Sequence, residues 1–169
     1  MDTKHILKTE RLLLRELNTG DAVSFYELNL NANVIKYTGD AAFENVEATA
    51  LFLQNYKDYQ ENGYGRWAVI DQSNGAFLGW CGLKYSKETH ETDIGFRFFE
   101  HCWNKGYATE SARACLDYGF KELGLKTIIG RAMEANIASI RVLEKLGLSY
   151  EKEFDFDGKR GLVYRIDKP

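Results

Sequence analysis

The spacing of apolar residues changes at residue 66, and this change constrains the fold more than any other feature of the sequence. Residues 66–70 read as a buried strand, and residues 72–75 supply a turn. Asn74-Gly75 is the strongest hairpin signal in the chain, because both residues tolerate the positive φ of a tight turn. We expect a return strand over residues 76–85 and a third strand over 92–98, together forming an antiparallel meander.

Helical spacing precedes the meander. Residues 11–15 (RLLLR) read as a first strand, and Gly20-Asp21 offers a stop followed by a helix N-cap. A first helix should follow, with its apolar side formed by Ala22, Phe25, Leu28 and Ala32. A second helix should begin near Asn45 and run to Asn62-Gly63, with Leu51, Phe52, Tyr56 and Tyr59 on one side.

Helices and strands alternate after the meander. Residues 107–123 carry a stripe of small and apolar side chains at helical spacing, and Gly124 is the predicted C-cap. Residues 127–132 predict a strand and 136–146 a helix. The chain should end in a hairpin whose turn is Asp157-Gly158. The predicted fold class is therefore α/β: a mixed, mostly antiparallel sheet flanked by helices.

Length and charge narrow the classes of function. The 169 residues suit one domain spanning 1–169, and the formal net charge is −3. A nucleic-acid partner is not expected, because such proteins usually carry a basic excess. A membrane partner is not expected either, because no apolar run approaches the roughly 20 residues of a membrane span. Cys81, Cys102 and Cys115 predict reduced thiols, no metal site and a cytoplasmic location.

The segment from Trp103 to Glu110 (WNKGYATE) is the clearest candidate for ligand binding. It lies between a predicted strand and a predicted helix, and Gly106 allows another group to approach the backbone closely. The first N–H groups of a helix have no intrahelical partner, so they can bind an anion such as a pyrophosphate. No GxxxxGK[ST] or GxGxxG pattern is present. A nucleotide-phosphate site of another kind stays open as a weaker alternative.

A second segment, residues 136–148, strengthens the interpretation of Trp103 to Glu110 as a ligand-binding segment. Residues 136–148 (NIASIRVLEKLGL) follow a predicted strand by a few residues, and Asp93-Ile94-Gly95-Phe96 ends the meander before Trp103 to Ala108. With these motifs in this order, the chain resembles the GNAT superfamily of N-acetyltransferases. It is most similar to the branch that includes the ribosomal-protein N-terminal acetyltransferases, and Thr9 to Arg15 resembles the first strand of that branch.

The resemblance implies an acetyl-CoA site between a splayed pair of parallel strands, residues 92–98 and 127–133. Backbone groups of Phe96, Arg97 and Phe98 would pair with the pantetheine arm. A backbone N–H there would stabilise the oxyanion, an interaction worth roughly 2.7–4 kcal/mol per donor. The other implied cofactor-binding residues are Trp103, Asn104, Lys105, Gly106, Tyr107, Ala108, Thr109, Asn136 and Ser139.

The resemblance also implies candidates for proton transfer. Asp93 is the first candidate for the base that takes a proton from the attacking amine, and Glu134 is the second. Leu143 stands where many relatives carry the tyrosine that protonates the leaving thiolate, so Ser139 is the expected donor. Trp103 also departs from the family pattern, which has glutamine or arginine there.

The implied activity is transfer of an acetyl group from acetyl-CoA to a primary amine. The acceptor is left open between a protein N-terminus, an amino acid, a polyamine and an amine-bearing drug. One alternative keeps the fold and changes the acyl group or makes the acceptor a hydroxyl. The other is a non-catalytic module that binds CoA as a sensor. The resemblance allows either a monomer or a homodimer.

Overall fold

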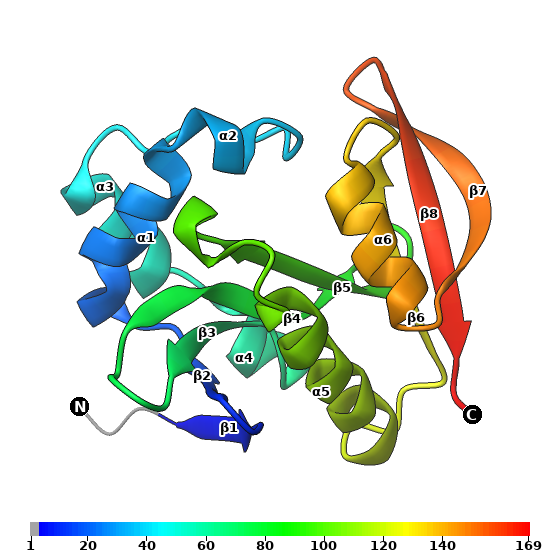
Figure 1. Cartoon of the computed structure of the whole chain (residues 1–169), viewed down its shortest axis with the longest axis horizontal. Coiled ribbons are helices and arrows are strands. Elements are labelled where there is room, and N and C mark those ends of the chain that lie inside the picture. Colours follow the sequence, from blue (N-terminus) through cyan, green and yellow to red (C-terminus); the bar gives the residue numbers. More distant parts are fainter. Residues whose placement is uncertain (1–3) are drawn as a thin grey trace.

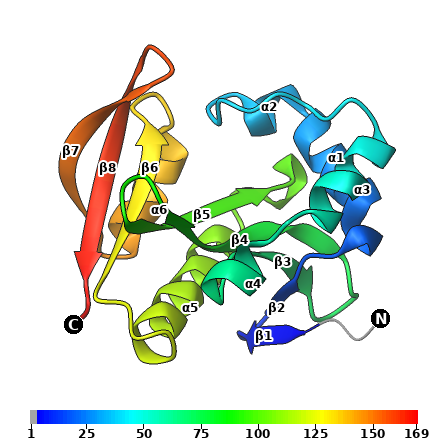
Figure 2. The ribbon, with the colours of Figure 1, turned by 180° about the vertical axis from the view of Figure 1, so that it is seen from behind.

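The computed structural model describes residues 4–169, and their strands form one sheet in the order β1-β2-β3-β4-β5-β6-β8-β7. Neighbouring strands are antiparallel except β5 and β6, which are parallel. Figures 1 and 2 show the ribbon from opposite sides. The strands are β1 (His5–Lys8), β2 (Leu12–Glu16), β3 (Arg66–Asp71), β4 (Phe77–Ser86), β5 (Glu91–Phe98), β6 (Thr127–Met133), β7 (Ser149–Phe156) and β8 (Lys159–Asp167).

The helices lie on both faces of this sheet. They are α1 (Ala22–Leu30), α2 (Ala32–Ile35), α3 (Val46–Gln54), α4 (Asp58–Asn62), α5 (Tyr107–Lys121) and α6 (Ile137–Lys145), with short 3₁₀ turns at Thr19–Asp21 and Glu100–Cys102. Within residues 4–169, no helix combines the length and apolarity needed to cross a membrane. The result is a mixed α/β fold of the expected class.

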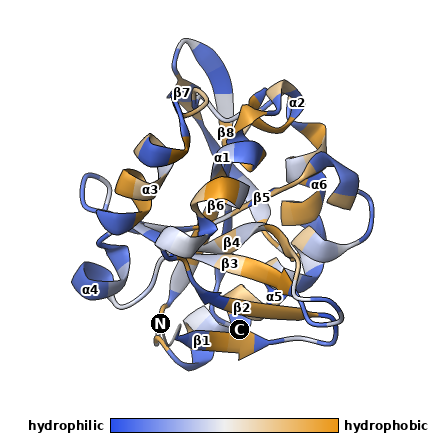
Figure 3. Cartoon of the chain, turned by 90° about the vertical axis from the view of Figure 1, so that its left-hand side faces the viewer, coloured by the Kyte–Doolittle hydropathy of each residue, from blue (hydrophilic) through white to orange (hydrophobic). Residues whose placement is uncertain are grey.

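Side chains of the central strands point alternately to the two faces of the sheet, where they pack into two separate apolar clusters. On one face Trp67, Val69 and Leu83 pack with Cys115 and Leu116 of α5. On the other face apolar side chains of β3 pack with α1 and α3; this smaller cluster includes Leu17, Ala22, Phe25, Leu53, Ala68 and Ile70. Figure 3 shows the contrast between the apolar central strands and the hydrophilic α4. The sheet therefore separates two apolar clusters, and α5 packs in the larger one.

The meander, both hairpins and the two later helices were predicted correctly. Gly75 has a φ of 75°, and Asp157 and Gly158 both have positive φ, as their turns require. In α5 the buried stripe is Ser111, Ala112, Cys115, Leu116, Gly119 and Phe120, as expected. The helix ends at Lys121, two residues before the predicted end, and Gly124 follows in the left-handed region.

Three details differ from the prediction. The second helix is interrupted after Gln54, because the hydroxyl of Tyr56 accepts a hydrogen bond from the Arg66 amide (2.8 Å) and α4 begins only at Asp58. Asp21 occupies the predicted N-cap position of α1, but its side chain makes no capping hydrogen bond, since its carboxylate pairs with Arg15 at 2.7 Å. The strand β1 was missed, because its four residues carry too short an apolar pattern.

A substitution at Leu83 tests the packing of the apolar cluster between the sheet and α5. Its side chain is fully buried, so Leu83→Ala removes packed methyl groups and leaves a cavity. We expect the free energy of unfolding to fall by about 2–5 kcal/mol, measured by urea denaturation. Lys87→Ala, at an exposed position beyond the same strand, should change it by less than about 0.5 kcal/mol. A loss at Leu83 as small as at Lys87 would contradict this packing.

Candidate active site

The parallel strands β5 and β6 touch at one register position and then separate. Asp93 pairs with Ile129, and within the described chain this is the only position where the backbones of the two strands are in ladder register. By contrast, β4 and β5 pair continuously from Ser86–Glu91 to Gly79–Phe98. Figures 1 and 2 show β6, β7, β8 and α6 standing apart from the rest of the sheet beyond this contact. The expected splay is therefore present, and β5 has a free edge beyond Asp93.

Asp93 lies where the two parts of the sheet meet. Its Oδ1 accepts a hydrogen bond from Arg66 of β3 at 2.6 Å, and its Oδ2 accepts one from Arg131 of β6 at 3.1 Å. Arg131 also pairs with Glu91 at 3.1 Å. Burial is the largest single influence on the pKa of Arg66 and lowers it. The charge and hydrogen bond of Asp93, with smaller contributions from Tyr56 and Cys81, together raise the pKa more, so the net shift is upward and Arg66 stays charged. We call Asp93, Arg66 and Arg131 the charge clamp.

Two glycines make room for the charge clamp. Gly82 and Gly95 are directly opposite each other on β4 and β5. The Arg66 guanidinium lies across this gap, and a Cβ on Gly95 would be 2.7 Å from its central carbon. Arg66 also donates to the Gly82 carbonyl at 2.8 Å. A side chain at position 95 would therefore push Arg66 away from Asp93.

A cleft of about 560 Å³ opens beside the charge clamp. Its floor is β5, one wall comes from β6 and α6, and the opposite wall comes from α1, α3 and the segment between them. The residues with polar or charged side chains in its lining are Asn29, Tyr37, Thr38, Asp40, Tyr56, Arg66, Trp80, Lys84, Asp93, Arg97, Arg131, Asn136 and Ser139. We call this volume the cleft throughout.

Arg97 ties the floor of the cleft to its helical wall. One of its nitrogens donates to the Asn29 side chain of α1, and another pairs with Asp40 at 2.7 Å. The Trp80 ring lies under the guanidinium groups of Arg97 (5.2 Å) and Arg66 (5.3 Å). Such cation–π contacts stabilise desolvated arginines. The prediction for Arg97 concerned its backbone, whereas this ordering role belongs to its side chain.

The segment after β5 forms an open turn ahead of α5. Asn104 and Gly106 both have positive φ (61° and 81°), and α5 begins at Tyr107 with no side-chain cap. Within residues 4–169, no acceptor is bound by the backbone N–H groups from Asn104 to Thr109. Trp103 donates its indole N–H to the Phe98 carbonyl at 3.0 Å, which holds the turn against the end of β5. This geometry suits an anion such as a pyrophosphate, and we call the turn the anion loop.

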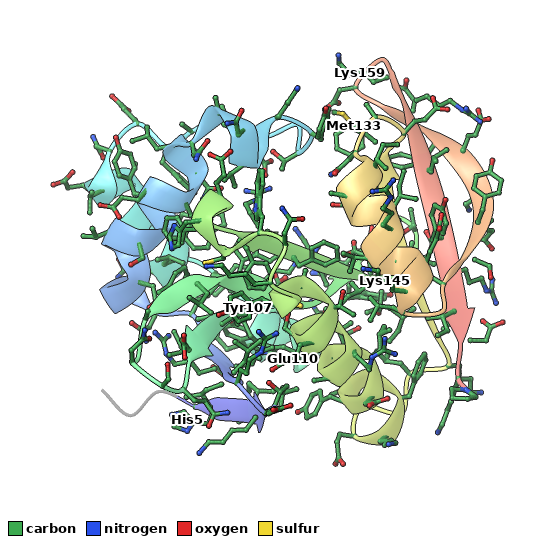
Figure 4. The ribbon with its side chains drawn as sticks, viewed as in Figure 1. His5, Tyr107, Glu110, Met133, Lys145 and Lys159 are labelled. Carbon is green, nitrogen blue, oxygen red and sulfur yellow. The ribbon has the colours of Figure 1, made fainter. Side chains whose placement is uncertain are left out.

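The anion loop is braced by the connection between β1 and β2. Glu110, in the first turn of α5, accepts from the Thr9 hydroxyl and pairs with Arg11 at 2.7 Å. The Arg11 guanidinium lies 4.5 Å from the centre of the Tyr107 ring. Figure 4 shows Tyr107 and Glu110 close together at the start of α5. This brace was not predicted from the sequence, because Glu110 lies 101 residues from Thr9 and 99 from Arg11.

Helix α6 brings Asn136, Ser139 and Leu143 to the cleft. Asn136 caps the helix, accepting from the Ser139 amide at 3.3 Å. The Ser139 hydroxyl is half-buried and has no hydrogen-bond partner among residues 4–169. Leu143 is buried against Gly130, where a Cβ would approach it to 2.6 Å. The capping role is therefore observed, and the cofactor roles of Asn136 and Ser139 stay predictions.

The structure separates the remaining predicted residues. Phe96 lines the cleft, whereas the Phe98 side chain is buried in the larger apolar cluster. Lys105 lies exposed on the anion loop. Glu134 does not line the cleft, and its half-exposed carboxylate pairs with Arg160. The two candidate bases are therefore not brought together, and only Asp93 faces the cleft.

Several cleft residues were missed by sequence reasoning. Arg66, Trp80, Lys84 and Arg131 all line it, although each occupies an ordinary strand position in the sequence. One signal was available: Gly82 and Gly95 interrupt two adjacent strands, and glycine in a strand often marks a close approach by another group. The identity of that group, the Arg66 side chain, depends on strand register.

Comparisons with known proteins fit this geometry. The family model for the acetyltransferase (GNAT) domain matches residues 11–149, so the chain belongs to the GNAT acetyltransferase family. A relative is the uncharacterized N-acetyltransferase YnaD of Bacillus subtilis, 37% identical over 149 residues that cover 88% of this chain and 85% of that protein. The resemblance to the GNAT superfamily is thereby confirmed.

Two solved structures share the fold at lower sequence identity. The ribosomal-protein-S5-alanine acetyltransferase of Vibrio fischeri has a TM-score of 0.80 and 18% identity, with 96% of both chains covered. The spermidine N-acetyltransferase of Vibrio cholerae, solved with CoA and spermine, has a TM-score of 0.78 and 22% identity. The match covers 95% of this chain and 97% of that one. These two likenesses establish the fold alone.

The brace at Glu110 predicts a dependence of stability on pH. Burial raises the pKa of Glu110, but the hydrogen bonds from Thr9 and Arg11 together lower it more. The pKa of Glu110 in the folded protein is therefore below its ordinary value of 4.5. A lowered folded-state pKa stabilises the fold above the unfolded value, and this stability is lost as the pH falls through the folded value. Glu110→Gln should therefore cost about 1 kcal/mol at pH 7 and progressively less below pH 4.5.

Chemical denaturation between pH 7 and pH 3 measures this difference. Glu122→Gln is the matched control, because Glu122 is an exposed acid just after the end of the same helix and its side chain has no partner among the described residues. A constant difference between wild type and Glu110→Gln across this range would show that the charge of Glu110 does not contribute.

Proposed function

We propose that this chain binds acetyl-CoA and transfers its acetyl group to a primary amine in the cleft. One observation carries the proposal: within the described residues β5 and β6 have a single register pair, and this leaves a free strand edge that runs from the charge clamp toward the anion loop. The free backbone groups of a strand edge can pair with amides, and the anion loop can bind phosphates. In acetyl-CoA the amides of the pantetheine arm are followed by the pyrophosphate, which is the order of the strand edge and the anion loop.

The chemistry proposed for the cleft is direct attack. The lone pair of a neutral amine forms a bond to the thioester carbonyl carbon, and the carbon–sulfur bond breaks with its electrons on sulfur. The amine must release one proton, and sulfur must receive one. In this proposal, a backbone N–H group on the free edge of β5, at Phe96 or Arg97, binds the oxyanion. The cleft walls orient the amine toward that edge.

Asp93 has a second role besides that of candidate base. Both of its carboxylate oxygens already accept hydrogen bonds from arginines, so protonating either one would remove an acceptor from the charge clamp. We propose that Asp93 mainly holds β3, β5 and β6 together and that cleft water receives the amine proton. The base role is the competing hypothesis.

Asp93→Asn separates these roles. Loss of the charge leaves Arg66 without an ion-pair partner beside a largely buried amide and leaves Arg131 paired only with Glu91, so stability should fall by about 3 kcal/mol. Turnover should fall by a similar factor at every pH. The measurements are urea denaturation and the pH dependence of kcat. Unchanged stability with a rate loss concentrated at low pH would make Asp93 the base.

Ser139 is the proposed donor to the departing sulfur, because its hydroxyl faces the cleft without a partner in the described chain. Ser139→Ala should lower kcat by about a hundredfold, the lower range for acid catalysis, with unchanged affinity for acetyl-CoA. Ser149→Ala, at an exposed serine outside the cleft, is the control. An unchanged kcat would assign the proton to water.

The activity itself is tested by release of free thiol from acetyl-CoA in the presence of a panel of primary amines. Amine-dependent release is expected. Binding of CoA without release on any amine would favour the non-catalytic module, which the buried Leu143 in the tyrosine position makes a specific alternative.

The free cysteines fit a cytoplasmic location, and a monomer or a homodimer is equally compatible with the site.

A further inference from the structure

The charges of the cleft point to the chemical class of the acceptor. Four basic side chains line it, Arg66, Lys84, Arg97 and Arg131, against two acidic ones, Asp40 and Asp93. The whole chain, by contrast, has a formal net charge of −3. The cleft is therefore locally cationic within an acidic protein.

Both acidic groups of the cleft are already paired. Asp40 binds Arg97 at 2.7 Å, and Asp93 binds two arginines through its two oxygens. A second ammonium group on an acceptor, as in a polyamine, would meet carboxylates that are neutralised and surrounded by guanidinium groups. The pairing disfavours a polycationic acceptor.

Lys84 differs from the other charged residues of the cleft because it forms no salt bridge within the described residues; its charge interacts with that of Glu88, outside the cleft. The Lys84 side chain is exposed, and its ammonium group has no hydrogen-bond or ion-pair partner among residues 4–169. It lies directly opposite Asp93 across β4 and β5, so both side chains project from the same face of the sheet as Trp80 and Arg97. A free cation at this position can bind an anionic group of a ligand.

The phosphates of CoA do not explain this positive charge. They are assigned to the anion loop, and none of the residues from Asn104 to Thr109 lines the cleft. Pantetheine and the acetyl group carry no charge. The three arginines of the cleft are paired with Asp40, Glu91 and Asp93, so Lys84 is the basic group available to the acceptor.

The helical wall adds an apolar surface. The centre of the Phe43 ring lies 5.9 Å from that of Phe25 and 5.3 Å from that of Phe52 in tilted contacts, and all three residues line the cleft. An acceptor with an apolar body can pack on these rings while its anionic group lies near Lys84. Together these features define an amphipathic, anionic acceptor.

We propose that the acceptor is a carboxylate-bearing primary amine with an apolar body, such as an apolar amino acid, whose carboxylate binds Lys84. This inference rests on the proposed acetyl transfer. It deepens that proposal by choosing one class among the amines that the sequence leaves open.

Two matched pairs of acceptors test the inference by thiol release from acetyl-CoA. One is phenylalanine and phenylalaninamide, compared at equal concentrations of neutral amine. The other is 4-(2-aminoethyl)benzoate and its carboxamide, in which the charge lies far from the amine. Spermidine is the polycationic comparison. We expect kcat/KM to be about tenfold higher for the carboxylate of each pair, the effect of one charge pair near a protein surface.

Variants connect this preference to Lys84. Lys84→Met should bring the ratio of carboxylate to amide close to one, and Lys84→Arg should keep it above one. Lys87→Met is the control, because Lys87 is exposed outside the cleft and pairs only with Glu61 within the described residues. Circular dichroism establishes that each variant is folded.

The outcomes separate the inference from the proposed function. Preference for the amides or for spermidine, or an unchanged ratio in Lys84→Met, would overturn the carboxylate class while acetyl transfer to amines stands. Absence of thiol release with every amine would overturn the proposed function and the inference with it.

Discussion

The charge clamp is the interaction on which the rest of the structure depends. Asp93 occupies the one register position where β5 meets β6, and its two oxygens bind arginines from β3 and β6. Breaking a largely buried ion pair by removing one partner is costly, because the other charge stays buried without compensation. The clamp can therefore hold the two parts of the sheet together at one point while they diverge beyond it.

That divergence determines where ligands can bind. Because β5 pairs with β4 along its whole length and with β6 only at Asp93, its other edge keeps unpaired backbone groups. The anion loop continues from the end of this strand, and the Trp103–Phe98 and Arg11–Glu110 contacts hold it in place. The separation of β5 from β6 thus provides two features at once. It leaves backbone groups free to bind a long, polar donor, and it opens a walled cleft for an acceptor.

The local patterns of the chain predict most of its elements. The Asn74-Gly75 and Asp157-Gly158 turns and the α5 stripe depend on neighbouring residues, so sequence spacing suffices for them. The charge clamp depends on strand register between segments more than 25 residues apart. The break before α4 likewise depends on a hydrogen bond to a later strand. Such contacts carry no local signature, and for that reason Arg66 and Arg131 were missed.

Calorimetric titration with acetyl-CoA tests the central claim most directly, because the splayed strands and the anion loop are required for binding before any chemistry. ATP and NAD serve as comparisons, since they share phosphate groups but lack pantetheine. The account predicts micromolar binding of acetyl-CoA and no comparable binding of the other two. Absence of binding up to millimolar acetyl-CoA, or equal binding of ATP, would contradict it.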